Sequence, residues 1–166
     1  MTWAETVGED IVITEQILPY AVVLSQECDL EHDFNNHTDE EKRAKNMDKG
    51  IPSILICPAY LAAEVRSGSH LSAQGLQMHP INSGEWNRVK QNGSYRYHFL
   101  TEDQENQIPD LVIDFKRYMT VPRDIAYRPT IKDQVLVSLS DLFREHLSSR
   151  FAHYLSRIGL PELVSD

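Results

Sequence analysis

Up to about residue 121, the apolar residues of this chain are grouped into short runs that polar and charged stretches separate. Runs this short are typical of β-strands and are too short for most globular helices. The runs at 20–26 and 52–57 are almost continuously apolar, so we expect two strands buried on both faces, the second ending at Pro58. The predicted strands are residues 10–14, 20–26, 52–57, 86–91, 94–100, 111–115 and 118–121.

After residue 137 the apolar residues change to steps of three and four along the chain. This spacing predicts an amphipathic helical segment over residues 138–159, which begins near Ser138 and ends at Gly159. The apolar face of such a helix needs a cover, so we expect it to pack on the sheet, on a protein partner or on a second copy of the chain. The apolar positions are Leu139, Leu142, Phe143, Leu147, Phe151, Leu155 and Ile158.

Asn92-Gly93 is the clearest turn signal in the chain. Both residues readily adopt positive φ, which favours a two-residue β-hairpin turn between residues 86–91 and 94–100. In the second strand aromatic and polar side chains alternate, which predicts one aromatic face and one polar face. The aromatic positions are Tyr95, Tyr97 and Phe99.

Polar insertions interrupt this body at residues 27–50 and 67–84. The first contains a capping-box pattern from Thr38 to Glu41, which predicts a short exposed helix near 39–47. The second contains Ser, Gly and His and is expected to be loop or broken helix, after helical turns at 60–65.

The length of 166 residues suits a single domain, and the formal net charge of −9 disfavours tight, unaided binding to nucleic acid. No apolar run approaches the length of a membrane span, and the first residues lack the pattern of a signal peptide. We therefore expect a cytoplasmic protein with no membrane partner. Cys28 and Cys57 are too few for a disulfide framework.

Four segments resemble, in their order and in their residue patterns, the MazF/PemK-like family of small SH3-like barrels, which act as toxins of toxin–antitoxin pairs. The resemblance implies an α+β, mainly β fold: one domain over 1–166, a barrel body at 8–121 with the two insertions, and the C-terminal helix. The matching segments are residues 8–12 (GEDIV), 22–26 (VVLSQ), 52–58 (PSILICP) and 112–121 (VIDFKRYMTV).

Members of this family cut single-stranded RNA. The family pattern has an arginine where this chain has residues 18–20 (LPY), and a Ser or Thr where it has residues 57–60 (CPAY). Without a cation, the pentavalent phosphate lacks an electrostatic stabiliser. We therefore expect a nucleic-acid- or protein-binding module, a catalytically altered relative in a toxin–antitoxin or defence setting. The alternative is an active endoribonuclease.

Two groups of basic residues in this acidic chain are candidates for contacts with nucleic acid, one at residues 88–98 and one at residues 116–128. Aromatic and basic side chains together can stack bases and contact phosphates. The other interpretation is a half-buried strand with core aromatics, and basic residues that pair with the acidic loop at 102–110. The candidate nucleic-acid-binding residues are Arg96, Tyr97, Lys116 and Arg117.

Cys28 follows the predicted strand at 20–26 and admits three hypotheses. In the first it is a thiolate nucleophile that a histidine activates and Asp29 orients, with Arg117 as a further candidate catalytic residue, although the flanking carboxylates raise the pKa of a thiol. In the second it is a metal ligand with His32 and His37, and with Asp29 or Glu31 as the fourth. Or it is a small buried residue at the end of a strand. We expect no cofactor.

Overall fold

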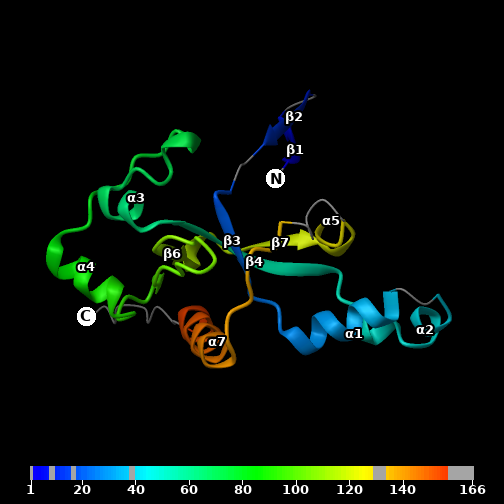
Figure 1. Ribbon diagram of the computed structural model, residues 1–166. Helices are drawn as coiled ribbons and strands as arrows, with labels where there is room; N and C mark the ends of the chain where they lie inside the picture. Colours follow the sequence, from blue (N-terminus) through cyan, green and yellow to red (C-terminus); the bar gives the residue numbers. More distant parts are fainter. Residues whose placement is uncertain (1, 8–9, 16–17, 38–39, 129–133, 157–166) are drawn as a thin grey trace, which may run out of the picture.

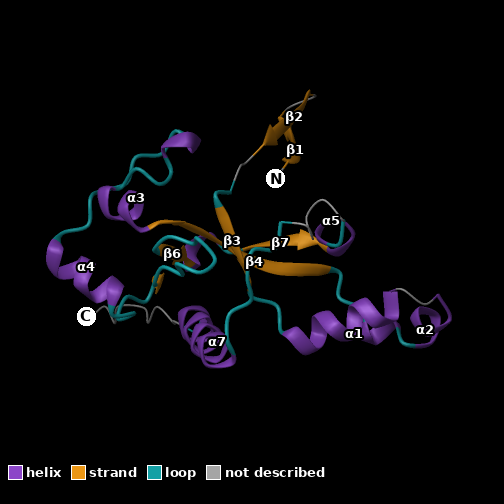
Figure 2. Cartoon of the chain, in the orientation of Figure 1, coloured by secondary structure: helices purple, strands orange, loops and turns teal. Residues whose placement is uncertain are grey.

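The computed structural model describes residues 2–7, 10–15, 18–37, 40–128 and 134–156. Its centre is an open, five-stranded antiparallel sheet in the order β3–β4–β6–β5, with β7 paired to the other half of β4 (Figures 1 and 2). The strands of this sheet are β3 (Tyr20–Val23), β4 (Ser53–Leu61), β5 (Tyr97–Leu100), β6 (Leu111–Asp114) and β7 (Met119–Pro122). Strands β1 (Thr2–Val7) and β2 (Asp10–Glu15) form a separate antiparallel hairpin, in which the predicted strand at 10–14 is confirmed.

Helices α1 and α2 extend from one end of β4, and α3 and α4 lie towards the other end (Figure 1). The α+β class is confirmed, but more of the described residues lie in helices than in strands, and the sheet does not close on itself. The helices and 3₁₀ turns (η) are α1 (Glu27–His37), α2 (Glu40–Lys45), η1 (Met47–Lys49), α3 (Ala62–Ser67), η2 (Ser72–Gln74), α4 (Ser83–Lys90), η3 (Phe115–Arg117), α5 (Arg123–Ala126) and α7 (Asp141–Leu155).

Strand β4 is the centre of the sheet, and the prediction that Pro58 ends it is wrong. Both backbone groups of Leu55 form hydrogen bonds on the β3 side. Its N–H donates to Ser25 Oγ, and its carbonyl accepts the Leu24 N–H. The backbone N–H and C=O groups of successive residues in a strand point to alternate sides, so the backbone of Pro58 faces the side away from β3. There the pairing with β7 ends at Ile56, and the pairing with β6 begins at Ala59. The missing N–H of Pro58 therefore falls at the junction between two partner strands.

Strand β3 is an edge strand, so the prediction that residues 20–26 are central and buried on both faces is wrong. It ends at Val23, whose side chain is 51% exposed, and it lies at one end of the strand order. The apolar run is explained by Tyr20, Val22 and Leu24, which pack from one face against the core.

The sheet separates two apolar clusters, because alternate residues of β4 and β6 point to opposite faces. One cluster packs beneath α3 and α4 and includes Tyr60, Val65, Leu71, Trp86, Val89 and Val112. The other packs beneath α7 and includes Cys57, Ala59, Ile113, Phe115, Leu147 and Phe151.

The predicted hairpin across Asn92-Gly93 is wrong, because residues 83–90 form helix α4. Asn92 has φ +54° and ends this helix. Its N–H bonds to the Val89 carbonyl at 2.9 Å, and the Gly93 N–H bonds to the Arg88 carbonyl at 2.7 Å. These two bonds form a Schellman motif, which uses the same left-handed Asn as a hairpin turn does.

Both faces of β5 are covered, so the predicted polar face of this strand is also wrong. The consecutive residues Tyr97 and His98 are both buried, at 8% and 1% exposed. The predicted strands at 111–115 and 118–121 are confirmed as β6 and β7, which the 3₁₀ turn η3 joins.

The insertion at 27–50 contains the predicted short helix as α2, and also α1, which its polar sequence did not predict. The expected cap Thr38 lies outside the described residues. The C-terminal helix is confirmed but begins at Asp141, and Gly159 lies outside the described residues. Leu147 and Phe151 are buried, whereas Leu142 and Phe143 are 75% and 57% exposed. Among the described residues of the predicted apolar stripe, Leu139, Leu147 and Phe151 pack on the core beneath α7.

Candidate anion-binding site

Two arginines converge on the carboxylate of Asp114, whose side chain is fully buried. Arg96 donates from Nε to Oδ1 at 2.7 Å and from Nη2 to Oδ2 at 2.6 Å. Arg117 Nε lies 3.8 Å from Oδ2. The carboxylate Oδ1 also accepts the backbone N–H of Lys116 at 3.1 Å and so caps η3.

The pairing of β5 with β6 places these side chains together. Tyr97 is opposite Asp114 in the strand register, and the Phe115 N–H bonds to the Arg96 carbonyl at 3.0 Å. Arg96 therefore enters the sheet beside the residue that ends β6, and η3 turns Arg117 back towards the same carboxylate.

The cluster carries a net positive charge in an acidic chain, since two guanidinium groups share one carboxylate. The side chains of Arg96 and Arg117 are 25% and 27% exposed, and Lys116 beside them is exposed. The hydrogen bonds that Arg96 donates to Asp114 raise the pKa of Arg96, so it stays charged. Arg96 also lies 4.8 Å from the centre of the Tyr97 ring, a cation–π distance.

Two neutral polar groups border this cluster. The Tyr60 hydroxyl and both ring nitrogens of His70 are buried. Their rings lie 5.1 Å apart in an edge arrangement. Burial lowers the pKa of His70, against the opposing effect of Asp114, so the imidazole is neutral at pH 7. Burial raises the pKa of Tyr60, so its hydroxyl remains a donor.

Four predicted nucleic-acid residues, Arg96, Tyr97, Lys116 and Arg117, are thus brought to one place. Sequence reasoning missed the carboxylate that organises them, and also missed Tyr60, His70 and Gln74, whose Oε1 accepts from Arg117 Nη1 at 3.3 Å. These residues come from β4, η2 and the loop between them, and no local pattern links them to β5.

Cys57 belongs to the core beneath α7 and is fully buried. Its thiol donates to the Asp114 carbonyl at 3.1 Å, and burial followed by the Asp114 charge raises its pKa. It is therefore no thiolate at neutral pH.

Cys28 is exposed in the first turn of α1, rather than buried. Its sulfur lies 3.7 Å from Gln26 Oε1 and 3.9 Å from Asp29 Oδ1, whereas the contacts of Arg117 are with Asp114 and Gln74. His32 and His37 lie further along the same helix. Within the described residues, no three His, Cys, Asp or Glu side chains are grouped so that they could hold a metal ion.

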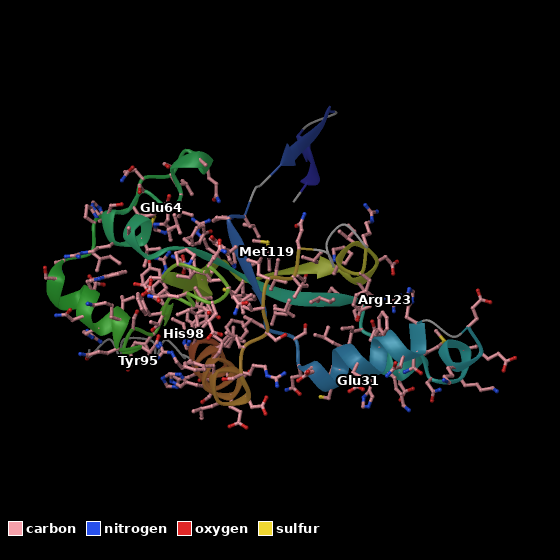
Figure 3. All side chains as sticks on the ribbon, in the orientation of Figure 1. Glu31, Glu64, Tyr95, His98, Met119 and Arg123 are labelled. Atoms are coloured by element: carbon pink, nitrogen blue, oxygen red, sulfur yellow. The ribbon has the colours of Figure 1, made fainter. Side chains whose placement is uncertain are left out.

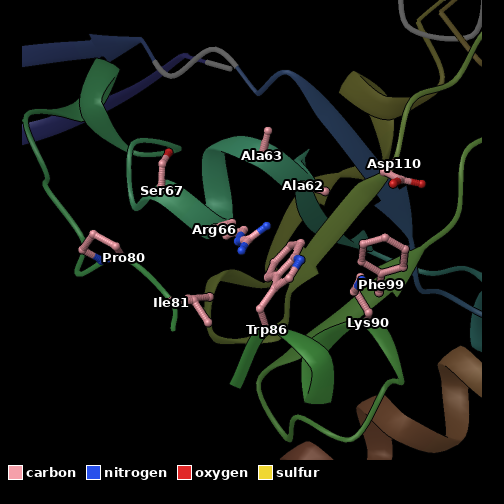
Figure 4. A pocket seen from close by; sticks show the side chains of 10 residues that line it. All are labelled: Ala62, Ala63, Arg66, Ser67, Pro80, Ile81, Trp86, Lys90, Phe99 and Asp110. Carbon is pink, nitrogen blue, oxygen red and sulfur yellow. The ribbon is translucent and has the colours of Figure 1, made fainter. Parts of the chain in front are cut away.

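A pocket of about 570 Å³ lies between α3 and α4 (Figure 4). Its wall includes Trp86, which packs edge-on against Phe99 at 6.1 Å, with Arg66 at 5.9 Å from the centre of the indole ring. Trp86 is only 7% exposed, so its ring belongs to the core and offers no open stacking surface.

Comparison of the chain with protein-family models, with curated proteins and with solved structures finds no match. Among the described helices, none has the length and apolar content that crossing a membrane requires.

Proposed function

We propose that this protein binds single-stranded nucleic acid, RNA foremost, through phosphate contacts at Arg96, Lys116 and Arg117. The observation that carries the proposal is the pair of partly exposed guanidinium groups on one buried carboxylate. Arginine forks match phosphate oxygens in geometry and in charge, and phosphate contacts supply most of the affinity for nucleic acid.

Asp114 prepares the site because it fixes the plane of the Arg96 guanidinium before any ligand arrives. It uses two N–H groups of Arg96, at Nε and Nη2, and a guanidinium has five. The remaining donors are available to an anion. Tyr95 and Tyr118 come directly before Arg96 and directly after Arg117 in the chain, and their rings pack on His153 and Phe151 of α7. They stay 55% and 45% exposed, and the exposed part can stack with unpaired bases.

We also propose that the protein is related to the MazF/PemK-like toxins and has altered chemistry. Three of the matching segments overlap β3, β4 and the β6–β7 region, all in one antiparallel sheet. We infer that this open sheet is a modified form of the SH3-like barrel. In this chain Arg96 directly precedes β5, and Lys116 and Arg117 lie in η3. The arginine of the family pattern would instead lie at the start of β3.

Cleavage of the bound strand is the second candidate function. The specific observation in its favour is a neutral His70 beside the cation cluster, since a neutral imidazole can accept a proton from a ribose hydroxyl. The cation cluster next to it would stabilise the charged transition state.

Fluorescence anisotropy with an end-labelled single-stranded RNA at low salt tests the binding function. Arg117→Ala should weaken binding at least about tenfold. Lys116→Ala should weaken it less, and Lys49→Ala is a matched exposed control that should bind as wild type does. Equal affinities for the wild-type and Arg117→Ala proteins would contradict the proposal.

The same RNA, analysed on a denaturing gel, tests cleavage. An active enzyme should give discrete fragments with the wild-type protein and none with His70→Gln. Intact RNA after incubation with excess wild-type protein leaves binding as the function.

The predicted protein partner or homodimer contact through the C-terminal helix stays a prediction. Leu142 and Phe143 are its candidate residues because both are exposed on α7. Light scattering on the Leu142→Ser protein checks it: a wild-type dimer that becomes a monomer supports the contact.

A further inference from the structure

Three strands of the central sheet have an outer edge, and these edges differ in their unpaired backbone groups. Strands β3 and β5 end the strand order, and β7 pairs with β4 alone. In an antiparallel pair, the N–H and C=O groups of alternate residues point away from the partner strand. An added strand would bond to these outward groups, so they decide which edge is open to a partner.

The outer edge of β5 is closed by side chains. The register with β6 turns the backbone groups of Tyr97 and Phe99 outwards. Asn92 bonds both groups of Phe99: its Oδ1 accepts the N–H at 2.6 Å, and its Nδ2 donates to the carbonyl at 3.2 Å. Ser94 Oγ accepts the Tyr97 N–H at 3.3 Å, and Arg150 of α7 donates to the Tyr97 carbonyl at 3.0 Å. An added strand would have to displace all of these bonds.

The outer edge of β7 is short and contains a proline. Figure 3 shows Met119, the first residue of this strand, next to β4. The backbone of Leu55 faces β3, so Thr120 opposite it turns its N–H and C=O away from β4. The next outward residue is Pro122, which has no N–H. Proline is one of the ordinary devices that keep a further strand from pairing with an edge.

The outer edge of β3 is open. The Leu24 N–H bonds to the Leu55 carbonyl, so Ala21 and Val23 turn their N–H and C=O groups away from β4. Within the described residues, no side chain and no second strand bonds to these outward groups. Both residues are exposed, Val23 to 51%. Strand β3 therefore has the backbone groups that a further strand needs.

The sequence around this open edge also lacks charge. Residues 16–26 contain no Asp, Glu, Lys or Arg, although 25% of the chain is charged. Exposed edge strands usually carry charged side chains, which oppose pairing with a further strand. On one face of β3 the exposed side chains of Ala21 and Val23 are apolar, and on the other face Val22 packs against the core beneath α7. An added strand would therefore meet apolar side chains on both faces.

We propose that the outer edge of β3 docks against β3 of a second copy of this chain, so that two sheets join into one. An antiparallel pairing centred on Val22 sets Ala21 of each copy opposite Val23 of the other. Each such pair exchanges both of its N–H···O=C bonds, so every outward group of the two strands finds a partner. The edge is thus complementary to itself, as a two-fold dimer requires, and no like charges face each other across it.

A contact through one short strand is small, so the dimer should form only at high protein concentration. The formal net charge of −9 on each chain also opposes association. Salt screens this repulsion and leaves the main-chain bonds and apolar pairs in place, so the dimer should become stronger as salt is added. Binding of RNA at Arg96 and Arg117 has the opposite dependence on salt. The two proposals can therefore fail independently.

Disulfide trapping tests the pairing register. The starting protein is Cys28→Ser, which removes the exposed thiol and keeps the buried Cys57. Ala21→Cys and Val23→Cys are introduced into it separately, and the two proteins are oxidised with copper phenanthroline, each alone and after mixing. The mixture should give a disulfide-linked dimer on a non-reducing gel, because the two thiols are directly opposite. Each protein alone should give far less, since identical positions are diagonal neighbours, about 7–8 Å apart.

Light scattering over a range of protein concentrations tests the edge itself. Val23→Pro removes one outward N–H and leaves the pairing with β4 intact, so it should stay monomeric where the wild-type protein is partly dimeric. Thr120→Pro is the matching change on the outer edge of β7 and should dimerise as wild type does. Circular dichroism checks that both variants fold.

Three results would overturn the proposal. They are a wild-type protein that stays monomeric at every concentration, equal trapping in the mixture and in the separate cysteine proteins, and wild-type dimerisation by the folded Val23→Pro protein. A dimer that Leu142→Ser abolishes and Val23→Pro retains would assign the contact to α7 instead.

Discussion

Arg96 and Asp114 form a two-bond ion pair at the point where β5 enters the sheet and β6 leaves it. The carboxylate is completely shielded, while about a quarter of the arginine side chain reaches solvent. The pair therefore joins the interior of the sheet to its surface. Its geometry makes the candidate anion site part of the fold.

Asp114→Asn should destabilise the protein strongly. The variant leaves Arg96 without its counter-ion, and breaking a buried ion pair from one side typically costs about 3–5 kcal/mol. Urea unfolding followed by circular dichroism measures the change. Asp124→Asn, whose side chain is 76% exposed beside Arg123, should lose less than about 1 kcal/mol. Similar small losses in both variants would show that the Asp114 pair adds little to stability.

Binding of single-stranded RNA should depend moderately on salt. Three cations on three phosphates predict a slope of log K against log[salt] of about −2, since each contact on a single strand contributes about −0.7. Lys116→Ala should reduce the magnitude of the slope by about 0.7. Anisotropy titrations at several salt concentrations give the slope, and a slope near zero would exclude binding through phosphates.

Acid should destabilise the protein through His98. Burial, with further contributions from Arg150 and His146, lowers the pKa of His98 to about 3. An unfolded histidine takes up its proton below about pH 6.5, whereas the folded one stays neutral to about pH 3. Stability is therefore complete above pH 6.5 and falls as the pH drops towards 3, by at most about 1.4 kcal/mol per pH unit.

His98→Phe should make the unfolding free energy depend less on pH, because phenylalanine does not titrate. Unfolding free energies at pH 4, 5, 6 and 7 measure the difference between the two proteins. The exposed His79→Gln variant is the control and should keep the wild-type slope. Parallel curves for wild type and His98→Phe would refute the assignment.

Alanine substitutions at Gly68 and Gly75 distinguish the cost of backbone strain from the cost of a steric clash. Both have positive φ, at +81° and +71°, so alanine at either position costs about 1–2 kcal/mol. At Gly68 a Cβ would also lie 2.2 Å from the Met78 carbonyl oxygen, whereas nothing lies within 4 Å at Gly75. Gly68→Ala should therefore lower the urea midpoint clearly more than Gly75→Ala. Equal midpoints would mean that the loop at 68–78 shifts freely.

Asn92 combines a left-handed backbone with a side chain that acts as a strand partner. Its Oδ1 accepts the Phe99 N–H at 2.6 Å, and its Nδ2 donates to the Phe99 carbonyl at 3.2 Å. Asn92→Gly loses these bonds but keeps an unstrained φ, and should cost about 1–3 kcal/mol. Asn92→Ala adds the strain and should be the less stable variant in thermal unfolding. The reverse order would show that the positive φ adds no strain for alanine, and an unchanged stability of Asn92→Gly would show that the side-chain bonds are unimportant.

Asn92-Gly93 also shows where prediction from sequence ends. The pair favours a left-handed turn, and that much is correct for Asn92. The residues before it were expected to form a strand, yet Asn82 caps them as a helix by accepting the Glu85 N–H at 3.0 Å. Strands such as β2 and β6, and helices such as α7, followed from local apolar spacing alone.

The candidate site was predictable only in part. Arg96 and Arg117 attract notice as basic residues in an acidic chain, and the structure places both at one carboxylate. Asp114 does not stand out in sequence, because its role depends on the register that sets it opposite Tyr97. Tyr60 is equally hidden, since it joins the site only when β4 pairs with β6. Strand pairing over such sequence distances has no local signature.

The position of β4 sets the order in which this chain can fold during synthesis. Ala59 pairs with Ile113 and Ser53 pairs with Pro122, so neither inner partner exists when β4 leaves the ribosome. The apolar residues of β4 therefore stay exposed until β6 and β7 have emerged. Such long-range pairing is slow and exposed to aggregation. Expression at reduced temperature should therefore raise the yield of folded protein.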